Sequence, residues 1–121
     1  MGKFVLKQTA TGFKFDLKAG NGEIIASSEI YKTEASCLNG IDSVKRNCVG
    51  EVEDQTVEGF EKKKHPKFEV FKDKAGEYRF RLKARNGETI ATGESYKTKP
   101  SCLNGIETIK KNAPEAPIDK I

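Results

Sequence analysis

The stretch SCLNGI occurs twice in the chain, at residues 36–41 and again at residues 101–106. Both copies belong to a longer internal repeat, because each residue from Phe15 to Cys48 corresponds to the residue 65 positions later, and most of these pairs are identical. Before this segment the offset is 64 residues, as between Phe4 and Phe68. A repeat of this length predicts a fold made of two similar structural units.

Each unit has the same pattern of expected strands. The segments KFVLK and KFEVFK alternate apolar and polar residues, and so do FKFDLKA and YRFRLKA, which is typical of β-strands with one buried face. Asn21-Gly22 and Asn86-Gly87 follow the second strand, and this dipeptide favours a tight hairpin turn because it accepts positive φ angles. A third strand is expected over EIIASSEIY and ETIATGESY.

The second part of each unit predicts a helix and a short last strand. Thr33 and Thr98 are suited to cap the helix, because a threonine side chain can accept a hydrogen bond from an early backbone N–H. The helices contain SCLNGI, and a short strand could cover VED in one unit and PID in the other. The expected unit is therefore β-β-β-α, with one further strand possible.

The chain length and the repeat together limit how many domains the chain can form. The 121 residues are enough for one compact domain but small for two. We therefore expect one domain over residues 1–121, with repeat one at 3–56, repeat two at 67–121 and a connection at about 57–66. The expected fold class is α+β, in which the duplicated β-β-β-α(-β) units form one antiparallel sheet with two helices on one face.

Two residues inside SCLNGI need an explanation, because Asn-Gly weakens a helix. Gly40 and Gly105 cost roughly 1 kcal/mol each relative to alanine, and we interpret them as sites where the helix is closely approached by a neighbour. Asn39 and Asn104 point away from the expected core. Either they cap a helix that begins there, or they are exposed within a continuous helix, which is the interpretation we favour.

The repeated segments KFEVFKD, GEYRFRLKA, NGE and CLNGIE resemble the YegP-like family of small bacterial tandem-repeat proteins. The residues that carry the resemblance are Asn86-Gly87-Glu88, Tyr96, Asn104-Gly105-Ile106 and Asn112, each mirrored in repeat one. The resemblance implies one sheet that carries two helices, with the last strand of each unit exchanged onto the other unit. It implies no function, because the family has none established.

The sequence offers little for catalysis. His65 is the only histidine and lies in the connection before a proline. Cys37, Cys48 and Cys102 fall on the apolar side of the helices, which favours buried, inert thiols over redox or nucleophilic roles. We therefore expect no enzyme activity, no catalytic residues, no metal site and no cofactor.

The second strand of repeat two suggests one binding hypothesis. Cations alternate with core residues in YRFRLKAR, so they are expected to share the sheet face that the helices leave open. Such a face could bind a polyanion such as nucleic acid weakly. The candidate residues are Arg79, Arg81, Lys83 and Arg85, with Lys14 and Lys18 in repeat one. The alternative is a solvated face on which Glu69 and Asp16 pair with these cations.

The favoured hypothesis is a protein-interaction or structural module with an unknown protein partner. A sheet edge or the helix faces that carry Asn39 and Asn104 could serve such a partner or a second copy of the chain. No apolar run approaches the ~20 residues of a membrane span, and the three cysteines contain no CxxC pair. We therefore expect a cytoplasmic monomer or weak homodimer that does not contact membranes.

Overall fold

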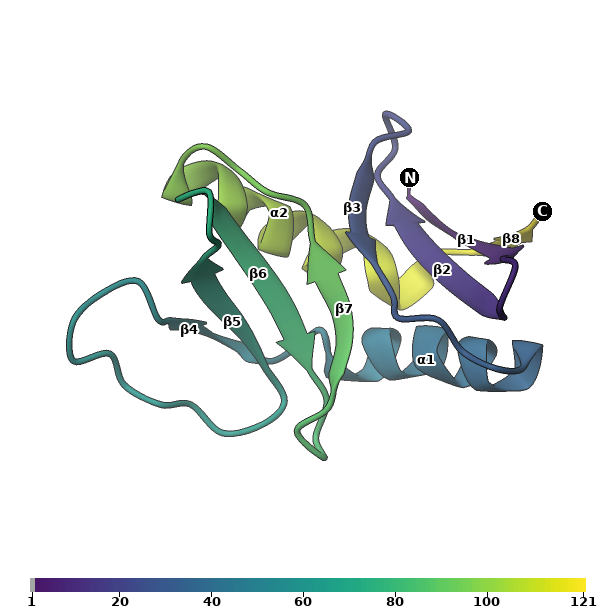
Figure 1. Cartoon of the computed structure of the whole chain (residues 1–121), viewed down its shortest axis with the longest axis horizontal. Coiled ribbons are helices and arrows are strands. Elements are labelled where there is room, and N and C mark those ends of the chain that lie inside the picture. The colour runs from purple at the N-terminus through teal and green to yellow at the C-terminus, as the bar shows by residue number, and fades with distance from the viewer. Residues whose placement is uncertain (1) are drawn as a thin grey trace.

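The computed structural model describes residues 2–121, and two helices pack against one eight-stranded sheet (Figure 1). The elements follow one another as β1 (Lys3–Gln8), β2 (Phe13–Lys18), β3 (Ile24–Ser27), α1 (Glu34–Asn47), β4 (Glu51–Asp54), β5 (Lys67–Lys72), β6 (Tyr78–Lys83), β7 (Thr89–Gly93), α2 (Lys99–Asn112), the 3-10 helix η1 (Ala113–Glu115) and β8 (Ile118–Lys120). The order β-β-β-α-β therefore occurs twice, as the repeat predicts.

The strand order in the sheet is β4-β5-β6-β7-β3-β2-β1-β8. Strand β4 belongs to repeat one but pairs with β5 of repeat two, and β8 of repeat two pairs with β1 of repeat one. The exchange of last strands is thus confirmed. Both edge pairs are parallel, so the sheet is mixed rather than wholly antiparallel. Parallel neighbours need a long connection, and the segment 55–66 supplies it between β4 and β5.

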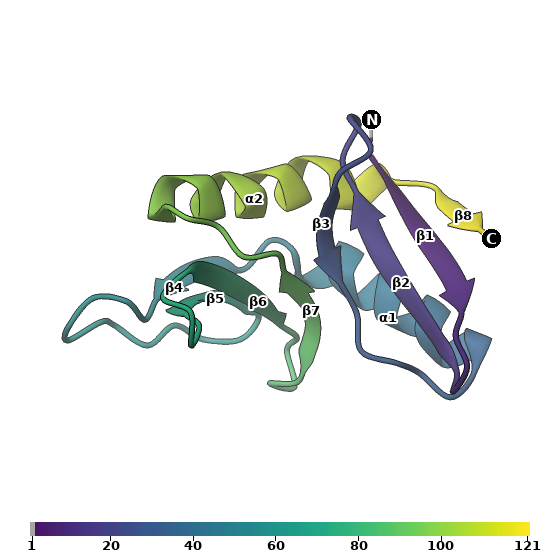
Figure 2. The same ribbon diagram turned by 45° about the horizontal axis from the view of Figure 1, so that its top comes forward.

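The two halves of the sheet meet where β3 pairs with β7. Ser27 lies opposite Thr92 in this antiparallel pair, and these two residues occupy equivalent positions of the repeat. An antiparallel pair between equivalent residues implies a pseudo-two-fold axis through that point, perpendicular to the sheet. Both helices therefore lie on the same face of the sheet, which Figure 2 shows from a second direction.

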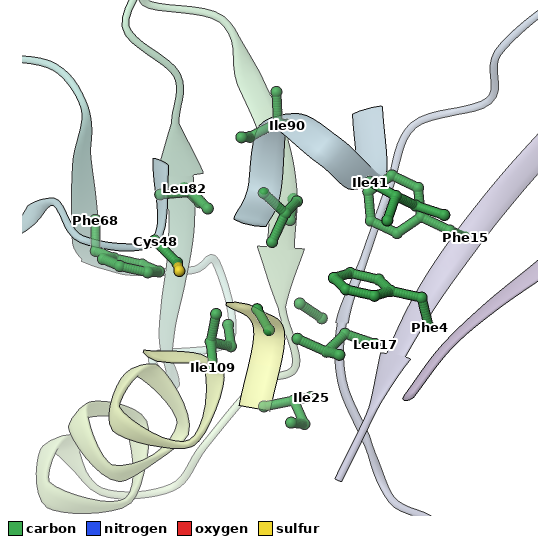
Figure 3. Packing of buried hydrophobic residues seen from close by; sticks show 14 of the residues in the cluster. Phe4, Phe15, Leu17, Ile25, Ile41, Cys48, Phe68, Leu82, Ile90 and Ile109 are labelled. Carbon is green, nitrogen blue, oxygen red and sulfur yellow. The ribbon is translucent and has the colours of Figure 1, made fainter. Parts of the chain in front are cut away.

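The core lies between the helices and this inner face. Phe4 and Phe15 of repeat one pack edge to face with ring centroids 5.7 Å apart, and Phe68 and Phe80 repeat the arrangement at 6.1 Å. Side chains from both repeats and both helices form one continuous cluster (Figure 3). Because a unit of about 50 residues buries little apolar surface alone, the shared core lets the two repeats bury their apolar faces together.

Each helix runs without interruption through its SCLNGI segment. Thr33 accepts a hydrogen bond from the backbone N–H of Ser36 at 3.0 Å, and Thr98 caps α2 in the same way. The continuous-helix interpretation is therefore correct, and Asn39 and Asn104 are exposed positions inside the helices. The third strands are shorter than predicted.

The glycines of SCLNGI lie where an aromatic side chain approaches the helix. A methyl group on Gly40 would collide with the Tyr31 hydroxyl, and one on Gly105 would collide with the Tyr96 hydroxyl. Tyr31 stacks on Phe15 with ring centroids 6.3 Å apart. The close approach is as predicted, and each tyrosine ring closes the edge of the core.

The hairpin turns use the repeated Asn-Gly pairs. Gly22 and Gly87 have φ angles of 86° and 85°, and no residue other than glycine has a positive φ among residues 2–121. Asn21 instead accepts a hydrogen bond from the Glu23 amide at 3.0 Å. Glycine therefore supplies the unusual backbone angle, and asparagine stabilises the turn with its side chain.

Candidate functional site

The outer face of the sheet, opposite the helices, carries a line of charged side chains across β4, β5 and β6. Lys67 Nζ lies 2.8 Å from Glu53 Oε1 and 3.2 Å from Glu69 Oε2, and Arg81 Nε contacts the other oxygen of Glu69. Glu53 is 1% exposed, and Lys67 and Glu69 are each 7% exposed. We call these four residues the outer-face charge network.

Hydrogen bonds hold the network in its charged state. Burial alone would raise the pKa of Glu53, but hydrogen bonds from Lys67, Gln55 and the Lys63 amide outweigh it and lower that pKa to about 2. Burial likewise opposes charge on Glu69, and bonds from Arg81 and Lys67 lower its pKa. Two carboxylates and two cations thus remain ionised together, which is how buried charges are tolerated.

The expected open face is partly covered at this end of the sheet. The connection between β4 and β5 forms a wide loop at the sheet edge (Figure 1), and the backbone N–H of Lys63 within it donates to Glu53 Oε1 at 2.7 Å. Buried carboxylates need hydrogen-bond donors, and the loop provides one. The loop therefore covers the Glu53 end of the outer face, whereas Phe71, Arg79 and Arg81 remain partly exposed.

The exposed part of this half contains an aromatic residue between two arginines. The Arg81 guanidinium carbon lies 4.4 Å from the centroid of the Phe71 ring. Arg79 Nε lies 3.3 Å from Asp73 Oδ2, and the Arg79 and Arg81 side chains are 38% and 34% exposed. Arg79 and Arg81 are thus present on the outer face, but each has a carboxylate beside it.

The same arrangement occurs in repeat one around a single buried carboxylate. Asp16 accepts a hydrogen bond from Ser27 at 2.7 Å, and the amino groups of Lys7 and Lys14 lie 3.1 and 3.7 Å from its oxygens. Burial alone would raise the pKa of Asp16, but the Ser27 and Lys7 hydrogen bonds and the charge of Lys14 lower it. The predicted pairing of Asp16 and Glu69 with neighbouring cations is present.

The remaining candidate cations differ in position. Lys18 and Lys83 form no ion pair with a side chain among residues 2–121. Arg85 lies beyond the end of β6, in the turn before β7, and lines a cavity beside α1 on the helix side. The predicted grouping of Arg85 with the outer-face cations is therefore wrong, because the strand ends at Lys83 and the chain turns there.

The two repeated asparagines of the helices have unequal surroundings. Asn104 lines a second, smaller cavity of about 170 Å³ together with residues of the β2–β3 hairpin. Asn39 is exposed on α1 and lines neither this cavity nor the one beside Arg85. The geometry thus brings Asn104 to the boundary between the repeats, and Asn39 only to the helix surface.

The three cysteines are buried and free. Burial raises the pKa of the Cys37 and Cys48 thiols, and burial with the nearby Asp54 charge raises that of Cys102 to about 11. A thiol with a raised pKa is a poor nucleophile at neutral pH, which agrees with the predicted packing role. Among residues 2–121, no group of three metal-binding side chains occurs, and no helix is long and apolar enough to cross a membrane.

Sequence reasoning missed the buried part of the charge network. Glu53 and Lys67 lie in short polar stretches that resemble exposed strand ends, and their burial depends on the exchanged strand and the connecting loop. The available signal was the register of β5 with β6, which places Glu69 opposite Arg81. It identifies one pair of the network but neither Lys67 of β5 nor Glu53, which the exchanged strand β4 adds.

The family model described as "Domain of unknown function (DUF1508)" matches residues 9–54 and 73–119, once in each repeat. A UPF0339 protein of Bordetella pertussis is 40% identical over 116 residues, which are 96% of this chain and 92% of the relative. A UPF0339 protein of Treponema denticola is 56% identical over 55 residues, which are 46% of this chain but 95% of the relative. That relative is therefore about one repeat long.

Two solution NMR structures have the same fold along nearly the whole chain. The yegP protein of Escherichia coli, of unknown function, matches with a TM-score of 0.80 and 32% identity over 98% of this chain and 91% of its own. A UPF0339 protein of Shewanella oneidensis matches with a TM-score of 0.79 and 31% identity, with coverage of 98% and 90%. These likenesses confirm the fold that the repeat predicts.

Proposed function

The chain belongs to the DUF1508 family, whose function is unknown and which includes the UPF0339 proteins, and from its own geometry we propose that it is a non-enzymatic protein-interaction module. The proposed contact surface is the exposed part of the outer face in repeat two, formed by Phe71, Arg79 and Arg81. The same proposal assigns the module to the cytoplasm, where its three free thiols stay reduced.

The observation that carries this proposal is the stacking of Arg81 on Phe71. Glu69 holds the Arg81 guanidinium, and the guanidinium lies above the Phe71 ring, so both side chains are ordered before any partner binds. Aromatic residues and arginine are enriched at protein interfaces. Preordered side chains also lose less conformational entropy on binding.

Charge pairing favours a protein partner over nucleic acid on this face. A polyanion gains affinity mainly when free cations replace its counterions. Arg79, Arg81 and Lys14 each lie beside a carboxylate of the same face, which reduces that gain. Weak nucleic-acid binding is the second candidate, supported by Lys18 and Lys83, which have no ion pair among residues 2–121.

The proposal can be tested by capture from a lysate of the source organism at low and moderate salt. The immobilised proteins are the native chain, the double variant Phe71→Ala/Arg81→Ala, and the control Lys7→Ala, which changes the outer face of repeat one. We expect a protein that the native chain and the control retain at moderate salt and that the double variant loses. The melting temperature of each variant verifies that it is folded.

A retained protein must then be mapped, because retention alone does not identify the surface. Amide NMR signals of labelled chain are compared with and without the purified partner. We expect the largest shifts in β5 and β6. Retention that is equal in all three proteins would overturn the proposal, and salt-sensitive retention of nucleic acid in place of a protein would favour the second candidate.

A further inference from the structure

A cavity of about 350 Å³ lies between the second half of α1 and the turn that joins β6 to β7. Helix α1 belongs to repeat one and the turn belongs to repeat two, so neither repeat forms the cavity alone. Its walls are made by Ser43, Arg46, Asn47, Ala84, Arg85 and Asn86. The volume is in the range of sites that hold small polar molecules.

Two guanidinium groups give the cavity its charge. Arg85 forms no ion pair with a carboxylate among residues 2–121, and no carboxylate lines the cavity. Arg46 Nε lies 3.0 Å from Asp42, but these side chains are 68% and 64% exposed, and exposed pairs of this kind contribute little. The contact uses only Nε, so the terminal nitrogens of Arg46 can bind another group.

Neutral side chains add hydrogen-bond donors whose orientation is fixed. Asn47, 8% exposed, donates from its amide nitrogen to the Ser43 carbonyl oxygen at 2.8 Å and to Ser43 Oγ at 3.0 Å. Because Ser43 Oγ accepts this bond, its own proton is available for another acceptor. Asn86 accepts the Glu88 amide through Oδ1 at 3.0 Å, which leaves its amide N–H groups available.

The second cavity serves as an internal comparison. Its walls contain Ala19, Asn21 and Thr108, which are the repeat equivalents of Ala84, Asn86 and Ser43. The position of Arg85 is taken by Gly20, and the carboxylate-bearing Glu23 lines this cavity. The fold thus forms two similar cavities, and only the first of them has two arginines in its walls.

We propose that the first cavity is a binding site for the phosphoryl group of a small phosphorylated molecule. Arginine guanidinium groups bind the oxygens of phosphate in pairs, and Ser43 and Asn86 supply donors for further oxygens. The site is independent of the outer-face proposal, because none of Phe71, Arg79 and Arg81 lines this cavity. Either proposal can therefore fail without the other.

The test is an NMR titration of the labelled full chain with inorganic phosphate and with glucose 6-phosphate, at constant ionic strength. Glucose and chloride are the comparison solutes. We expect saturable shifts of the amides of residues 43–47 and 84–87 with both phosphates, larger affinity for the ester, and no saturable shift of residues 19–22.

Variants then test whether Arg85 binds the phosphoryl group. Arg85→Gly copies the residue of the second cavity and is expected to weaken phosphate binding about tenfold or more. Lys111→Ala, which changes the repeat equivalent of Arg46, is expected to leave binding unchanged. The amide spectrum of each variant verifies its fold. The proposal is overturned if neither phosphate shifts the cavity amides, if both cavities respond equally, or if Arg85→Gly binds as the native chain does.

Discussion

At the scale of single residues, the least expected feature is a set of charged side chains buried on the sheet face that has no helix on it. Glu53 and Lys67 are nearly inaccessible, and each forms ion pairs or hydrogen bonds with its neighbours. A buried ion pair contributes little net free energy to stability. Removing one partner nevertheless destabilises the fold strongly, because the other charge is left buried without compensation. The network therefore makes the attachment of β4 sensitive to single substitutions.

We predict that Glu53→Gln lowers the free energy of unfolding by about 3–5 kcal/mol at neutral pH. The three groups that contact the Glu53 carboxylate all donate hydrogen bonds, and an amide cannot accept all of them. Urea unfolding measures the change. Asp119→Asn is the matched control, because Asp119 occupies the equivalent register position in β8 and pairs with Lys3 as Glu53 pairs with Lys67. The Asp119 side chain is 48% exposed, so the effect of this substitution should be smaller.

The lowered pKa of Glu53 also predicts how the free energy of unfolding depends on pH. Its pKa is about 2 in the folded chain against an ordinary value of 4.5, so the folded state binds its proton less readily than the unfolded state. The contribution of this carboxylate is fully present above about pH 4.5 and is lost as the pH falls toward 2. The stability difference between the native chain and Glu53→Gln should therefore narrow on acidification, and a constant difference would contradict the assignment.

The sequence predicts part of this residue-scale picture. The cross-strand pairing of Glu69 with a cation follows from strand alternation, since both residues fall on polar positions of adjacent strands. The burial of Lys67 does not follow, because it requires Glu53 from an exchanged strand and a loop that folds over both. Contacts set by distant parts of the chain leave no local pattern.

At the scale of elements, local sequence signals predict the repeated helix, but only its packing explains the glycine within it. The apolar positions and the Thr33 cap predict α1 correctly, and Gly40 is explained only by the tyrosine ring that lies against it. The exact neighbour could not be predicted, because Tyr31 reaches the helix from an isolated bridge after β3 rather than from a regular strand.

We predict that Gly40→Ala destabilises the chain by about 1–3 kcal/mol, although alanine favours a helix by roughly 1 kcal/mol over glycine. The added methyl group requires displacement of the Tyr31 ring, which is stacked on Phe15. Thermal unfolding measures the change. The neighbouring exposed substitution Asn39→Ala should instead stabilise by about 0.5 kcal/mol, and a Gly40→Ala chain that melts above the native one would refute the packing role.

At the scale of the whole molecule, the exchange of last strands joins two repeats into one sheet and one core. The repeat in the sequence predicts duplication and the helix positions, since both follow from spacing and periodicity. The exchange itself is implied by the family resemblance, and the parallel direction of the edge pairs becomes apparent only in the structure. Each repeat thus completes the sheet of the other.

We predict that removal of residues 118–121 weakens repeat one, although these residues belong to repeat two in sequence. The loss removes the β8–β1 pairing and the contacts of Lys3 with Asp119 and of Lys120 with Glu34. Hydrogen exchange should be faster at β1 amides and nearly unchanged in β5. Equal acceleration in both strands would indicate a general loss of stability rather than loss of the exchanged strand.

The central claim about the molecular surface is that Arg79 and Arg81, the arginines of the outer face, are each paired with a carboxylate of the same face. The most direct test is fluorescence anisotropy of labelled single-stranded RNA and duplex DNA at low and moderate salt, with the native chain and with Arg79→Glu/Arg81→Glu. We predict that the native chain binds weakly even at low salt, and that the variant, which has two cations fewer and two carboxylates more, binds only slightly more weakly. Tight binding by the native chain that weakens with salt and is absent from the variant would contradict the claim and identify this face as a nucleic-acid surface.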